Sequence, residues 1–254
     1  MRSLSKRAGL VATLLLMVAF FGASVTGAAV AVKGGDIVPP VIPATEPLAV
    51  AVGSVQAALN SRLSALHQLS VLVAASRSLT SSNQVALSSL IDSDSSALGL
   101  LEVSVSTAQS VSVLNSDASQ MVLDYHVFAL ATPEVKDVIS ADKSLEQSQS
   151  LMRQIPAIEA TVSASGLRSE SESAATELLV QLPARLQSAQ SVLNGVVPAL
   201  IALTPSSIPA SLPTLAAAAS ATRAAAGDIR AADALVAQIT GIIAGTGRAS
   251  HAKR

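Results

Sequence analysis

The three histidines are the side chains best suited to holding a metal ion, and they lie far apart in the chain. No two of His67, His126 and His251 have the four-residue spacing that presents two ligands on one face of a helix. A zinc site needs three or four ligands in a fixed geometry. A site built from these histidines would therefore require tertiary contact between distant segments, and we expect no metal.

The acidic run from Asp92 to Ser96 is a second candidate, because it resembles the start of a calcium-binding loop. Such a loop needs glycine at its sixth position and a bidentate glutamate at its twelfth. Those positions hold Ala97 and Val103. We therefore interpret the run as an exposed helix face, and we expect neither a bound calcium ion nor a cofactor.

Nucleophilic catalysis is the next chemistry to consider, because serine is abundant whereas cysteine is absent. The chain contains no Gly-x-Ser-x-Gly motif, and no serine is linked by its sequence context to a histidine and an acid. We predict that the protein is not an enzyme. Paired carboxylates from different helices remain the one acid–base arrangement that leaves no local signature.

The stretch from Tyr125 to Pro133 contains both aromatic residues that follow the N-terminal apolar run. Tyr125 and Phe128 are three residues apart, so they share one face of a helix, and Pro133 is expected to bend that helix. We expect Phe128 to be buried beside Tyr125. The bend could also open a candidate groove, lined by Tyr125, His126, Phe128 and Asp142.

The charged residues beside this stretch also fit a simpler interpretation. Asp124, Lys143 and Glu146 flank the aromatic residues together with Asp142. On helix surfaces such groups form ion pairs worth only about a few tenths of a kcal/mol.

The N-terminus has the organisation of an export signal. Three basic residues precede an uncharged run from Ala8 to Val32, whose most apolar part extends from Leu10 to Phe21. Small residues then fit signal-peptidase cleavage after Ala29 or Ala31, so we expect residues 1–31 to be a signal peptide. The alternative is an uncleaved anchor, because the uncharged run is long enough to span a bilayer.

The composition after the leader argues against nucleic acid as a partner. Of sixteen Lys and Arg, three lie in the leader, which leaves thirteen against seventeen Asp and Glu, a net charge near −4. This excess of acidic residues does not provide the basic surface that binds nucleic acid. Four prolines and two glycines between Val32 and Pro47 favour an extended spacer over residues 32–45.

From Thr45 onward, apolar residues recur at steps of three and four, which is the pattern of amphipathic helices. The first helix is expected to begin near Thr45, and the second at a capping box formed by Ser81 and Gln84. A third runs from Val111 to about Ser165, with a kink or break at Thr132 before Pro133. The fourth carries the stripe from Ala175 to Leu203, and the fifth spans about Pro209 to Ile243.

These segments predict an all-α fold. We expect an elongated antiparallel bundle of about five long helices with coiled-coil-like packing. The bundle would form one domain over residues 46–245, followed by a basic disordered tail at 246–254.

A resemblance rests on the region that follows the first helix and on several short motifs, namely Asp124 to Leu130 with Pro133, Ala141-Asp142-Lys143, Leu203-Thr204-Pro205 and Asp228 to Asp233. These motifs resemble those of an uncharacterised family of secreted helical proteins from actinobacteria. Where those proteins usually have Tyr-Arg-Val-Tyr, this chain has His126 and Phe128 in place of the arginine and the second tyrosine. The resemblance implies export and a helical fold, with no established activity.

The function expected from these observations is contact rather than catalysis. The protein would act as a secreted or cell-envelope bundle through its surface, on a partner in the envelope or outside the cell, and would touch the membrane only through the leader before cleavage. The alternative is a carrier of an apolar small molecule or lipid, bound between helices where the alanine- and valine-lined seam is loosest.

Overall fold

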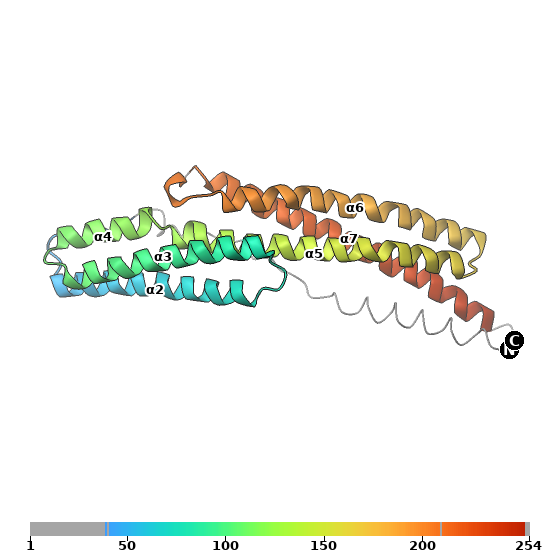
Figure 1. Ribbon diagram of the computed structural model, residues 1–254, viewed down its shortest axis with the longest axis horizontal. Coiled ribbons are helices and arrows are strands. Elements are labelled where there is room, and N and C mark those ends of the chain that lie inside the picture. Colours follow the sequence, from blue (N-terminus) through green and yellow to red (C-terminus); the bar gives the residue numbers. More distant parts are fainter. Residues whose placement is uncertain (1–38, 40, 209, 252–254) are drawn as a thin grey trace. The chain divides into compact units, whose positions relative to one another are not determined.

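The chain is almost entirely helical over residues 39, 41–208 and 210–251, which the computed structural model describes (Figure 1). No strand occurs in these residues, so the predicted all-α fold is confirmed. The signal peptide expected at 1–31 and most of the expected spacer lie outside the described residues. The elements are α2 (Leu48–Ala75), α3 (Ser81–Thr107), α4 (Val111–Leu123), the π-helix η2 (Val127–Ala131), α5 (Thr132–Ala164), α6 (Ser169–Ile201), the 3-10 helix η3 (Pro205–Ser207) and α7 (Leu212–His251).

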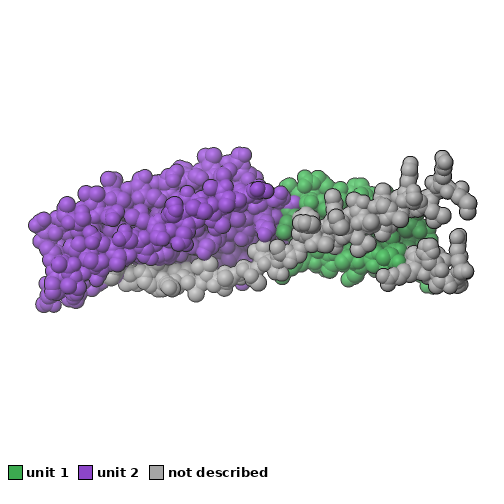
Figure 2. Space-filling model, turned by 90° about the horizontal axis from the view of Figure 1, so that it is seen from below, with its two compact units in different colours: residues 1–29, 147–190, 226–254 green, residues 30–146, 191–225 purple. Residues whose placement is uncertain are grey.

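The helices are divided between two compact units, where the sequence suggested one domain over 46–245. The described part of unit 1 comprises residues 147–190 and 226–251, and that of unit 2 comprises 39, 41–146, 191–208 and 210–225 (Figure 2). Helices α5, α6 and α7 each contribute residues to both units. Each unit is therefore described by itself.

In unit 2, α2 and α3 form an antiparallel hairpin whose turn is centred on Ser78. Leu69 and Leu87 each lie nine residues from Ser78, and Val55 and Leu101 each lie twenty-three residues from it. All four are buried, which fits pairing in layers across the hairpin. Burying each such side chain stabilises the fold by about 1.5 to 3 kcal/mol.

The cap of α3 lies one residue earlier than the predicted capping box. The Thr80 side chain accepts a hydrogen bond from the Asn83 backbone N–H at 3.2 Å. Thr80 is held there because its own N–H donates to Asp142 Oδ2 at 3.1 Å. The position of the cap thus depends on a residue 62 positions away in the chain.

The end of the predicted spacer is fastened to unit 2. The Ile42 N–H donates to Asn115 Oδ1 at 2.8 Å, and Asn115 Nδ2 donates to the Ile42 carbonyl at 3.0 Å. One side chain amide of α4 therefore satisfies both backbone groups of Ile42, much as a neighbouring strand would.

The helical chain is interrupted between α4 and α5, earlier than the break predicted at Thr132. Backbone dihedral φ of His126 is 44°, in the left-handed region, and the π-helix follows directly. The Thr132 N–H reaches back five residues to the Val127 carbonyl. Pro133 explains the wider turn, because its ring would clash with the carbonyl four residues earlier in a regular α-helix.

In unit 1, the predicted stripe of the fourth helix is buried, including Leu182, Leu186 and Ala189 on α6. Ser148 Oγ on α5 donates to the buried Leu186 carbonyl at 3.2 Å. Helix α5 ends at Ala164, close to the end predicted at about Ser165, and Gly166 follows with φ of +60°. Helix α7 continues to His251, so the backbone of residues 246–251 is helical where a disordered tail was expected.

None of the helices among the described residues has an apolar stretch long enough to cross a membrane.

Candidate functional site

Two charged residues occupy core positions of the hairpin in unit 2. Arg62 on α2 is 6 % exposed, and Asp94 on α3 is 7 % exposed. Each lies sixteen residues from Ser78, so the register places them in the same layer of the hairpin. Charged side chains are rarely fully buried unless they are paired with another group.

Arg62 meets an aromatic ring contributed by η2. Its guanidinium carbon lies 5.2 Å from the centre of the Phe128 ring, within the range of a cation–π interaction. Arg62 Nη1 also donates to the Ala58 carbonyl at 3.2 Å. Phe128 and Tyr125 are both half-buried, so the prediction that Phe128 fills the core beside Tyr125 is wrong. The ring instead covers the guanidinium group.

Glu134, in the first turn of α5, is the most deeply buried acid near this layer, with 2 % of its surface exposed. Burial, and then the charge of Asp94, raises the pKa of Glu134 to about 8. Burial raises the pKa of Asp94 to about 6. At neutral pH, Glu134 is therefore mostly protonated and Asp94 mostly ionised.

One oxygen of each acid has no hydrogen-bond partner in the described part of the chain, namely Asp94 Oδ2 and Glu134 Oε2. An unpaired oxygen in the interior costs free energy, and the cost is far greater for an ionised carboxylate. We refer to Arg62, Asp94 and Glu134 as the buried charged layer.

Tyr125 lies beside the buried charged layer. Burial raises its pKa, the charges of Asp124 and Asp94 raise it further, and a hydrogen bond with Gln120 opposes them. The end of α4 and η2 therefore bring both aromatic residues to one place, Tyr125 near Asp94 and Phe128 over Arg62.

The remaining residues of the predicted groove have other positions. Asp142 is buried and accepts hydrogen bonds from the Thr80 N–H at 3.1 Å and from Asn83 Nδ2 at 2.8 Å. These contacts make it a support for the start of α3. His126 is 3 % exposed and sits where the backbone turns into η2.

The buried charged layer was not among the sites predicted from the sequence, although the apolar pattern of α3 contained one signal of it. The apolar stripe of α3 has a gap between Ile91 and Leu98, and Asp94 fills that gap in the core. On α2, Arg62 takes the core position next to Leu63, which is only half-buried. A charged residue at the missing position of a regular stripe was the available clue.

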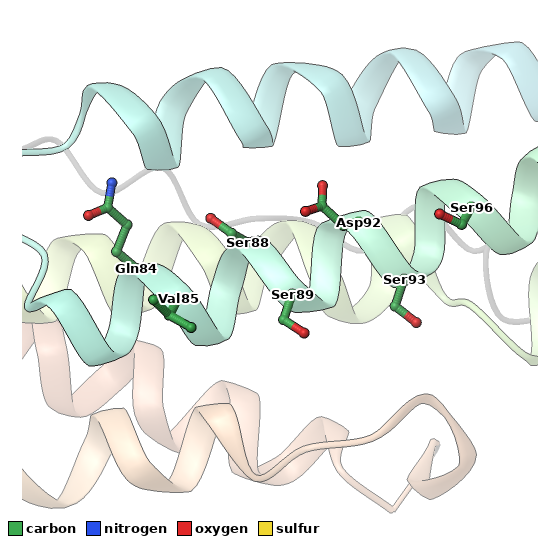
Figure 3. Close-up of a pocket in the computed structure, with 7 residues that line it drawn as sticks. All are labelled: Gln84, Val85, Ser88, Ser89, Asp92, Ser93 and Ser96. Atoms are coloured by element: carbon green, nitrogen blue, oxygen red, sulfur yellow. The ribbon is translucent and has the colours of Figure 1, made fainter.

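The acidic run on α3 is split between two faces of the helix. Asp92 and Ser93 are exposed, as predicted for this run, whereas Asp94 points into the core. An open, shallow depression lies along the exposed side, and Figure 3 shows that all of its labelled residues belong to α3. They are Gln84, Val85, Ser88, Ser89, Asp92, Ser93 and Ser96.

Within the described residues, no group of three or more His, Cys, Asp and Glu side chains is arranged to hold a metal ion. The buried charged layer can hold and release protons, but its acids are too buried for a substrate to reach them without movement of the helices. Comparisons with protein-family models, with curated proteins and with solved structures give no match for this chain.

Proposed function

We propose that the protein is an exported helical bundle that acts through contact of its surface with a partner in the cell envelope or outside the cell. The observation that carries this proposal is the outward face of α3. Val85, Leu100 and Val103 are 70 %, 76 % and 62 % exposed, respectively. At 100° per residue they fall on one side of the helix, together with Ser89, Asp92 and Ser96.

The alignment of these side chains matters more than their exposure. Single exposed aliphatic residues are common on protein surfaces. Here three of them lie on a line that is otherwise made of small serines and one acid, which lets another surface approach closely. Covering these aliphatic side chains would remove apolar surface from water, which favours association.

The core supports a contact role over that of a carrier. Large side chains of both units are fully buried, including Leu59, Leu66 and Leu98 in unit 2 and Leu182 and Leu186 in unit 1. The burial of Glu134 and Asp94 likewise supports a non-enzymatic role, since the acids with the most shifted pKa values lie away from solvent. The export part of the proposal rests on the pattern of residues 1–31.

The test is affinity capture from native envelope material with the purified mature chain, comparing wild type with a variant carrying Leu100→Ser and Val103→Ser. The matched control is Val180→Ser, which removes a side chain of similar exposure, 72 %, from α6. We expect a partner that is lost with the α3 variant and retained with the control. Equal capture by all three proteins would contradict it.

A further inference from the structure

The least regular backbone in unit 2 lies against the buried charged layer. Among the described non-glycine residues, only His126 has a positive φ, and η2 follows it as a five-residue π-helix. Phe128, within η2, places its ring over Arg62, and Glu134 follows η2 in the first turn of α5. We refer to residues 125–131 as the hinge segment.

The backbone of the hinge segment is less regular than that of the helices on either side. Left-handed backbone is unfavourable for a residue with a Cβ atom, and π-helical turns are uncommon and often found at functional positions. Local opening begins where the backbone structure is least stable. In unit 2, the hinge segment has this irregular backbone, and the burial of Val127 and Leu130 holds it closed.

Ionised Glu134 would be poorly accommodated in the closed structure. It is 2 % exposed, Oε2 has no hydrogen-bond partner among the described residues, and Asp94 lies close enough to raise its pKa. In unit 2, the described residues of α6 and α7 include a single charged residue, Arg223. Its charge lowers the pKa of Asp137, against the effect of burial. Among the groups on other elements, Asp94 on α3 acts on Glu134 by raising its pKa. Tyr125, after α4, lies near Asp94 and Asp124, and Arg62 on α2 shares a layer of the hairpin with Asp94.

We propose that ionisation of Glu134 opens the hinge segment, so that unit 2 carries a pH-dependent conformational switch controlled by the buried charged layer. Movement of η2 away from α2 would admit water to the Glu134 carboxylate and separate Phe128 from Arg62. The closed form holds the proton on Glu134, and the open form lacks it. Because burial and Asp94 raise the pKa of Glu134 to about 8, the opening falls in mildly alkaline conditions.

Hydrogen exchange followed by mass spectrometry tests the switch on the full mature chain. Exchange is compared at about pH 6 and about pH 9, with correction for the intrinsic dependence of exchange on pH. We expect protection of peptides covering residues 123–135 to fall at least about tenfold more than protection of unit 1 peptides covering 178–190. Equal changes in the two regions would overturn the proposal.

Two variants separate ionisation of Glu134 from other effects of pH. Glu134→Gln keeps the shape of the side chain without its charge, and is expected to stay protected at both pH values. Glu146→Gln, which changes an exposed glutamate on the same helix, is expected to open as wild type does. Opening of Glu134→Gln to the wild-type extent would assign the effect to another group and would overturn the proposal.

A measurement on the wild-type chain covers the case in which Glu134→Gln does not fold. The carboxyl carbon of Glu134 is followed by NMR as the pH is raised, alongside the exchange of the hinge segment. We expect both changes to share one midpoint. A carboxyl that titrates in the ordinary range of glutamate, or at a midpoint different from that of the opening, would overturn the proposal.

Discussion

Phe128 lies over Arg62 with its ring centre 5.2 Å from the guanidinium carbon, which places an aromatic ring from a π-helix on a cation buried in a helical hairpin. The arrangement explains how a bundle can keep a charged residue in a core layer. Helices α2 and α3 form the hairpin that contains Arg62, and η2 provides the ring that covers its guanidinium group. The same contact ties the hinge segment to the hairpin.

Loss of the ring should destabilise unit 2 modestly. Phe128→Leu keeps an apolar side chain but removes the cation–π interaction, so we expect a loss of about 1 to 2 kcal/mol in the free energy of unfolding. Phe128→Tyr retains the ring and should cost less. Chemical denaturation followed by circular dichroism measures both, and equal effects of the two substitutions would show that the ring contributes nothing specific.

Stability should depend on pH through Glu134. Its pKa is about 8 in the folded protein, against an ordinary value of 4.5, so the folded state holds more protons than the unfolded state between these values. Stability is then greatest at the acidic end of this window and falls as the pH rises towards about 8.

The variant Glu134→Gln should lack this dependence, because its amide cannot ionise. Above about pH 8 we expect it to exceed wild type by roughly 3 to 5 kcal/mol relative to the difference at about pH 5. Thermal or chemical unfolding across this range measures the difference. Parallel stability curves for the two proteins would show that Glu134 titrates in the same way in both states.

Replacing the two buried charges of the α2–α3 hairpin, Arg62 and Asp94, should not lower the stability of unit 2. A double variant with Arg62→Leu and Asp94→Leu would continue the apolar stripes of α2 and α3, and we expect it to be more stable by about 1 to 4 kcal/mol. Denaturation midpoints of wild type and variant give the comparison. A large loss of stability would mean that the two charges are required for packing.

Processing of the leader can be read directly from the protein recovered outside the cell. Mass spectrometry should find the mature N-terminus at Val30 or Val32, as expected for cleavage after Ala29 or Ala31. Intact Met1 in the membrane fraction would establish the anchor interpretation instead.

The helices could be predicted from the sequence because their apolar stripes depend only on local spacing. On α6, for example, Leu182, Leu186 and Ala189 belong to the predicted stripe from Ala175 to Leu203, and all three are buried. The site could not be predicted in the same way. The Arg62–Phe128 contact and the burial of Glu134 depend on tertiary packing, and the cap at Thr80 depends on Asp142. The left-handed backbone of His126 lies seven residues before Pro133, and periodicity alone did not locate that turn.

Photo-crosslinking in the native envelope is the sharpest test for contact through the outward face of α3. A photoreactive residue is placed at Leu100 in one protein and at Val180 in another, since the two positions have similar exposure. We expect one crosslinked partner at Leu100 that is not obtained at Val180. No crosslink at Leu100, or the same products at both positions, would contradict it.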